Sequence, residues 1–145
     1  MATVYGVNRT KIRAMSPVNL LEPEQTGAKV KWVYDEYVTA ALAAGSIIEV
    51  CPNLPDEARI VDWIIDHDAL ADVSLRFGTS ADDDEFMANV SCASAGKKNF
   101  TSNGISLSLG FEIESGDGQT LIITTAGPSA ATGTIKVAVA YTTKG

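Results

Sequence analysis

The sequence has few charged side chains, only one histidine, only two cysteines and no long apolar run. Of its 145 residues, 20% are charged and 46% are hydrophobic, which excludes a disordered chain, a collagen and a coiled coil. A chain of this length completes a hydrophobic core without disulfides or metals, so one globular domain is expected. The longest apolar stretches, such as residues 40–44, are far shorter than the roughly 18 residues that cross a bilayer. We therefore expect neither a membrane span nor a secretory signal.

The scarcity of histidine and cysteine leaves little material for a metal or catalytic centre. The single imidazole, His67, lies between Asp66 and Asp68, a pattern that could serve as a metal ligand or a base. Strand alternation would turn His67 away from both carboxylates, so a passive role is favoured. Cys51 and Cys92 are expected to be reduced, small residues of the core.

Four consecutive acids at residues 82–85 form the densest charge cluster in the chain. Carboxylates bind calcium, but the loop spacing of an EF-hand is missing. We favour an exposed loop that leads into one or two helical turns over residues 80–87, because acids are stabilising near a helix N-terminus. No metal and no cofactor is expected, and an enzyme is improbable.

The residues that are abundant are typical of strands. Valine, isoleucine and threonine together fill 36 positions, whereas leucine fills nine. Apolar and polar residues alternate over 105–114 and 133–141, which predicts two strands with one buried face each. The Asp-Gly step at 117–118 predicts a hairpin that joins 105–114 to 120–125. Together with strands predicted at 29–38, 47–51, 58–66 and 73–78, this composition favours an all-β antiparallel sandwich or jelly roll.

The charges are distributed unevenly along the chain. Residues 1–34 carry five bases and two acids, whereas residues 35–85 carry thirteen acids and two bases. Residues 1–28 alternate poorly and contain Pro17 and Pro23, so we interpret them as an extended basic arm. The domain is then residues 29–145. Its acidic middle would repel phosphate, so no nucleic-acid partner is expected. The cations of the arm could pair with acidic surface on another chain, or could simply be solvated.

Four short stretches of the sequence are informative together: residues 5–11 (YGVNRTK), 31–37 (KWVYDEY), 58–62 (ARIVD) and 132–141 (TGTIKVAVAY). They resemble the small head proteins of tailed bacteriophages. Members of this family are taken to be capsid decoration, or cement, proteins. The resemblance implies a jelly-roll-like domain on the capsid exterior, commonly a homotrimer, that binds the major capsid protein and ties neighbouring capsomers together.

Candidate contact residues follow from charge and residue type rather than from a family motif. Arg9, Lys11 and Arg13 are predicted to touch the capsid. Aromatic residues are enriched at interface centres, so Trp32, Tyr34 and Tyr37 are predicted to form the subunit interface. Two other hypotheses stay open. One is a carbohydrate- or host-binding β-sandwich of the virion that uses Trp32 and Trp63. The other is a hydrolase, for which His67 is the sole candidate base.

Overall fold

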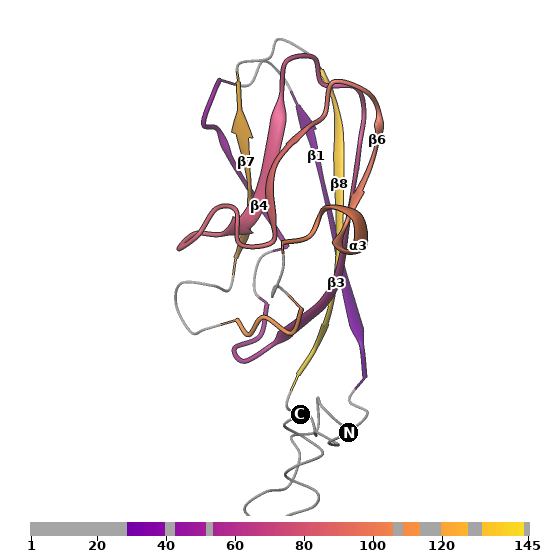
Figure 1. The fold of residues 1–145 in the computed structure, drawn as a ribbon. Helices are drawn as coiled ribbons and strands as arrows, with labels where there is room; N and C mark the ends of the chain where they lie inside the picture. Colours follow the sequence, from indigo (N-terminus) through magenta and orange to yellow (C-terminus); the bar gives the residue numbers. More distant parts are fainter. Residues whose placement is uncertain are drawn as a thin grey trace, which may run out of the picture.

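The structure is a computed structural model that describes residues 29–39, 43–51, 54–105, 109–113, 120–127 and 132–143. Within these ranges the chain forms two four-stranded sheets and one short helix (Figure 1). In chain order, the elements are β1 (Lys31–Thr39), β2 (Ile47–Val50), β3 (Arg59–His67), β4 (Ser74–Thr79), β5 (Met87–Ser91), β6 (Gly96–Asn99), α3 (Phe100–Asn103), β7 (Leu121–Ala126) and β8 (Gly133–Thr142). The described residues contain no helix long and apolar enough to cross a membrane.

The strand order confirms the predicted fold class. One sheet has the order β1-β8-β3-β6 and the other the order β2-β7-β4-β5. Every neighbouring pair is antiparallel. With the exception of β4 and β5, consecutive strands belong to opposite sheets, so the two sheets are interleaved along the chain. This arrangement is an all-β antiparallel sandwich.

The core lies between the sheets and is built by the alternation seen in the sequence. In β8 the odd-numbered residues Ile135, Val137 and Val139 are buried. Trp63 of β3 meets Phe77 of β4 edge to face, with ring centroids 5.4 Å apart. Phe77 and Phe86, and then Phe86 and Phe111, continue the aromatic chain at 5.3 and 5.2 Å. These contacts join the two sheets through large apolar surfaces.

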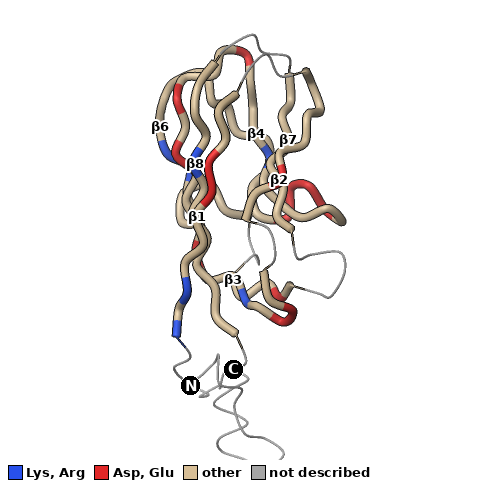
Figure 2. The backbone as a smooth tube through the Cα atoms, turned by 180° about the vertical axis from the view of Figure 1, so that it is seen from behind, with Lys and Arg blue, Asp and Glu red and all other residues tan. Residues whose placement is uncertain are grey.

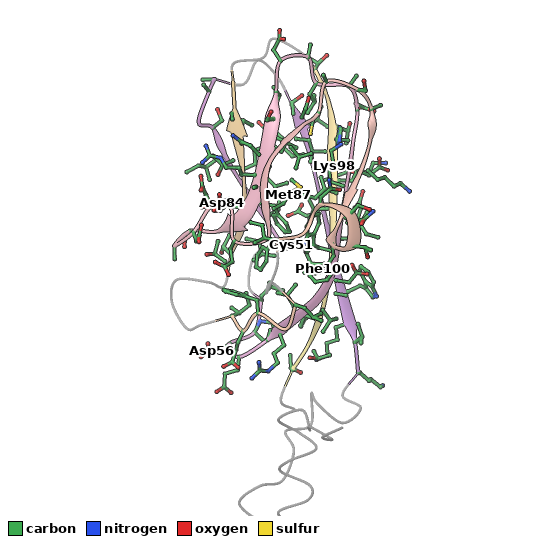
Figure 3. The ribbon with its side chains drawn as sticks, viewed as in Figure 1. Cys51, Asp56, Asp84, Met87, Lys98 and Phe100 are labelled. Atoms are coloured by element: carbon green, nitrogen blue, oxygen red, sulfur yellow. The ribbon has the colours of Figure 1, made fainter. Side chains whose placement is uncertain are left out.

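Both cysteines lie in the core, as predicted. Cys51 and Cys92 are both buried and both free of a disulfide. Figure 3 places Cys51 and Met87 inside the sandwich, whereas Asp56 lies at its surface. Burial raises the pKa of Cys51 to about 12 and that of Cys92 to about 11, so both thiols are protonated near neutral pH.

The predicted hairpin between 105–114 and 120–125 is wrong. β7 pairs instead with β2 and β4. The described part of the other predicted strand, residues 109–113, pairs with the beginning of β3. The N–H of Ile60 donates to the carbonyl of Phe111 (2.9 Å), and that of Ile113 donates to the carbonyl of Ala58 (2.8 Å). Alternation correctly indicated that Ile113 is buried, but a period of two does not identify the strand opposite.

The predicted helix at 80–87 is also wrong. Residues 80–86 form a turn in which the N–H groups of Thr79 and Glu85 both donate to the carbonyl of Asp82. Phe86 and Met87 are fully buried, and their burial between the sheets extends the chain into β5 where a helix would have turned. The helix that does form, α3, was not predicted. Its cap is Asn99, whose side chain accepts from the N–H of Ser102 at 2.8 Å.

Candidate interaction surface

The outer face of the β1-β8-β3-β6 sheet is a candidate interaction surface. Directly opposed residues of an antiparallel pair lie on the same face of a sheet. Because Ile135, Val137 and Val139 of β8 point into the core, the alternate residues Lys136, Ala138 and Ala140 and their partners lie on the outer face, although Ala140 is itself buried there. One such row joins Tyr34, Ala138 and Ile64 across three strands. The next row places Trp32 opposite Ala140.

The outer face carries exposed aromatic and aliphatic side chains along β1. Trp32 is 55% exposed, Tyr34 60% and Val38 67%. The hydroxyl of Tyr34 donates to Glu36 Oε2 at 2.9 Å, and this hydrogen bond raises the pKa of Tyr34. Large apolar residues at such exposure form a strip that a partner could cover.

A row of alternating charge crosses the same face. The paired positions run Glu36, Lys136, Asp66 and Lys97 over β1, β8, β3 and β6. Figure 2 shows acidic and basic segments lying close together on β1, β8 and β6. Beside the row is a shallow hollow of about 150 Å³, which Tyr34, Ile64, Asp66, Lys97, Lys136, Val137 and Ala138 line. Sequence reasoning missed this row, because its members lie far apart in the chain and only strand register aligns them.

The predicted interface residues are not all brought together. Trp32 and Tyr34 share the outer face, but Tyr37 pairs with Ile135 and therefore lies on the opposite face. Tyr37 is 39% exposed because β1 is an edge strand. The predicted capsid-contact residues Arg9, Lys11 and Arg13 lie outside the described residues, as does the predicted arm 1–28.

The lone histidine sits on the inner side of β3. His67 is buried, and its Nδ1 lies 2.9 Å from the carbonyl oxygen of Asp68. A carbonyl oxygen only accepts, so Nδ1 carries the proton. Nε2 has no hydrogen-bond partner among the described residues. Asp66 lies on the outer face through its pairing with Lys136, so strand alternation separates it from His67 as predicted. Both residues, together with Asp68, nevertheless line a hollow of about 150 Å³ at this end of the sheet.

The acidic turn brings three carboxylates together. Oxygens of Asp82, Asp83 and Asp84 lie within 4.8 Å of one another. A hydrogen bond between Asp82 and Asp84 lowers the pKa of Asp82 and raises that of Asp84. Arg76 Nη1 is 3.1 Å from Asp83 Oδ2. The carboxylates of this turn are thus held partly by other groups of the protein.

The two tryptophans do not form a joint platform for a sugar. Trp63 is fully buried between the sheets, whereas Trp32 is exposed on β1. Stacking on a sugar ring requires an accessible aromatic face, so the version of the carbohydrate hypothesis that uses both residues is wrong.

Comparison with known proteins found solved structures with a similar fold. No family model matches the chain, and no curated protein matches it by sequence. A chain of the cyanophage Pam1 capsid asymmetric unit has a TM-score of 0.65 at 22% identity, covering 81% of this chain and 87% of that chain. A chain of the Ralstonia phage GP4 capsid has a TM-score of 0.61 at 22% identity, covering 86% of this chain and 91% of that chain. The fold is therefore shared over most of the length of each chain.

Proposed function

We propose that this chain is a structural protein of a bacteriophage virion. In this proposal it is a decoration protein that binds the exterior of the capsid, contacts the major capsid protein and stabilises the contacts between capsomers as a homotrimer. The observation that carries the proposal is the fold shared with chains of two phage capsids over at least 81% of this chain. The short sequence stretches that resemble phage head proteins support the same role.

The surface chemistry suits a protein that works through contact area. Trp32 and Tyr34 stand on an open sheet face beside the charged row. Aromatic side chains provide large contact areas with little loss of conformational entropy. A shell also repeats the same contact many times, so individually weak contacts become collectively strong.

The proposed capsid contact is the basic arm, residues 1–28. Its cations Arg9, Lys11 and Arg13 precede its first acid, Glu22. The described domain carries fourteen acids and seven bases, so the arm differs in sign from the body. A cationic segment of this kind can pair with acidic surface on a shell, and such pairing weakens with salt because mobile ions screen exposed charges.

Binding to phage heads tests the proposal. Purified protein is titrated onto heads that lack decoration, and bound protein is measured by co-sedimentation. Saturable binding is expected, and a variant with Arg9, Lys11 and Arg13 changed to Gln should bind at least about tenfold more weakly. A matched variant with Glu22 and Glu24 changed to Gln alters charge in the same arm and should still bind. Failure of the wild-type protein to bind the heads of its own phage would refute the proposal.

A further inference from the structure

The two outer strands of the β1-β8-β3-β6 sheet carry opposite charge at the same level. Asp35 and Glu36 are adjacent on β1, at one end of the sheet. Lys97 and Lys98 are adjacent on β6, at the other end. Strand register connects them, because the row that begins at Glu36 ends at Lys97. Asp35 begins the adjacent row, on the core side, and Lys98 ends it. At the level of these two rows, one edge of the sheet is therefore acidic and the opposite edge basic, whereas Lys31 adds a positive charge farther along β1.

We propose that copies of this chain associate head to tail through these edges, with β6 of one copy pairing antiparallel with β1 of the next. In this register Lys97 lies opposite Glu36 of the next copy, and Lys98 lies opposite Asp35. The alternating charges of the outer row then continue from copy to copy without a break in sign. This inference deepens the self-association in the proposed function and rests on it only for the number of copies.

Strand direction and hydrogen-bond geometry both permit this register. Four antiparallel strands place β1 and β6 in opposite directions, so an added β1 continues the pattern. The N–H of Glu36 is turned away from β8, since it donates to Asp35 Oδ1 at 2.9 Å. The N–H of Asn99 is turned away from β3, since it donates to Asn103 Oδ1 at 3.2 Å. Residues two apart in a strand point their main chain the same way, so Lys97 also presents its N–H and C=O to the open edge.

Pairing exchanges one local hydrogen bond for an inter-strand pair. The N–H of Glu36 leaves Asp35 Oδ1 and donates to the carbonyl of Lys97 of the neighbouring copy, and the N–H of Lys97 donates to the carbonyl of Glu36. The carboxylate of Asp35 keeps its bond to the N–H of Cys51, which is 3.0 Å long. Its released oxygen then faces the ammonium of Lys98. No buried acceptor is left unpaired by the exchange.

The same register covers the exposed strip of β1. Tyr34 falls opposite Asn99 of the next copy, and Trp32 lies just beyond the end of β6, at the level where the short helix α3 follows. The side chains of Trp32 and Tyr34 are more than half exposed in the single copy. Their burial against β6 and α3 would supply the apolar part of the contact.

The two edges differ, so the contact is heterologous. Repeated use of a heterologous contact either closes a ring or extends an open chain. The trimer of the proposed function is the ring of three.

Disulfide crosslinking tests directly which residues of β6 and β1 lie opposite each other. The variant E36C/K97C places two thiols at opposed positions, about 5.5 Å apart between Cα atoms in a hydrogen-bonded pair, which a disulfide spans. Within one copy the two positions are three strand spacings apart, about 14 Å, too far for a bridge. Mild oxidation should therefore give covalent multimers on a non-reducing gel. The matched variant Y37C/K97C has its thiols on opposite faces and should remain largely uncrosslinked. Equal crosslinking of both variants, or of neither, would overturn the register.

Charge exchange provides the second test. Reversal at one edge, E36K or K97E, should weaken self-association about tenfold or more in sedimentation velocity. The double variant E36K/K97E should restore it, although the intramolecular neighbours Lys136 and Asp66 remain mismatched. E49K makes the same charge change on β2, in the other sheet, and should have no effect. Absence of rescue in a double variant with native circular dichroism would refute the edge contact.

Failure of the edge contact can be distinguished from failure of the proposed function. Each variant is also titrated onto phage heads. If the wild-type protein binds heads but the E36C/K97C variant forms no covalent multimers, the edge inference is overturned and the shell role stays intact. Head-to-tail crosslinking without any binding to heads would support the edge contact and refute the shell role.

Discussion

Replacement of Trp32 by Ala should weaken self-association and leave the stability of the fold almost unchanged. Trp32 is 55% exposed on the outer face of β1. A tryptophan offers up to about 250 Å² of surface, so about 140 Å² remains for a neighbouring copy to cover. At about 25 cal/mol per Å², complete coverage contributes about 3.5 kcal/mol to each contact. The association constant for one contact should therefore fall by up to about three-hundredfold.

Two measurements on the same variant check this expectation. Sedimentation velocity over a range of concentrations gives the association constant, and urea unfolding of dilute protein gives the free energy of unfolding. The W32A variant should lose association while its free energy of unfolding changes by less than about 1 kcal/mol, as for most exposed positions. The control Trp63→Ala removes a fully buried side chain and should lower the free energy of unfolding by about 3 to 5 kcal/mol. Unchanged association of W32A would refute the assignment of this face to an interface.

Two further predictions concern the folded domain. A Cβ at Gly78 would clash with the carbonyl oxygen of Asp82, whereas one at Gly96 would meet nothing within 4 Å. Gly78→Ala should therefore lower the free energy of unfolding, measured in urea, by at least about 1 kcal/mol, and Gly96→Ala should not. An equal effect at both sites would contradict the packing of the acidic turn. Burial raises the pKa of Cys51 to about 12 and of Cys92 to about 11, from 9.0. Above about pH 9 the unfolded thiols lose protons that the folded ones keep, so stability should fall with pH by up to about 1.4 kcal/mol per pH unit for each thiol. Unfolding at pH 8 to 10 checks this, and the Cys51→Ala variant should show a shallower slope; an unchanged slope would argue against burial of the thiolate-forming group.

The fold class could be predicted because the alternation of apolar and polar residues within a single strand shows which of its faces is buried. The alternation in β8 places Ile135, Val137 and Val139 in the core, and the structure confirms it. The pairing of the strands could not be predicted, because any apolar face can cover any other. The segment around Ile113 pairs with the beginning of β3, and β7 pairs with β2 and β4.

The acidic turn shows how tertiary packing overrides a local signal. Residues 80–85 have the composition of a helix start, with a capping serine and acids in the first turn. Phe86 and Met87, which follow, are fully buried between the sheets. Gly78 also lets the turn approach β4 closely. These two constraints act across the fold, and no short window of sequence contains them.

The candidate surface was predictable only in part. Trp32 and Tyr34 could be singled out by residue type, and both are exposed on one face. The charged row could not, because Glu36 and Lys97 become its two ends only through the pairing of four strands. Tyr37 shows the limit of an argument from type alone, since its backbone position turns it to the other face.

Quantitative mass spectrometry of purified phage particles tests the central claim most directly. A decoration protein is a stoichiometric part of the head, so this chain should be present in a fixed, small-integer ratio to the major capsid protein, and the ratio should persist through gradient purification. Particles that lack the chain, or that carry only trace amounts of it, would contradict a structural role in the virion.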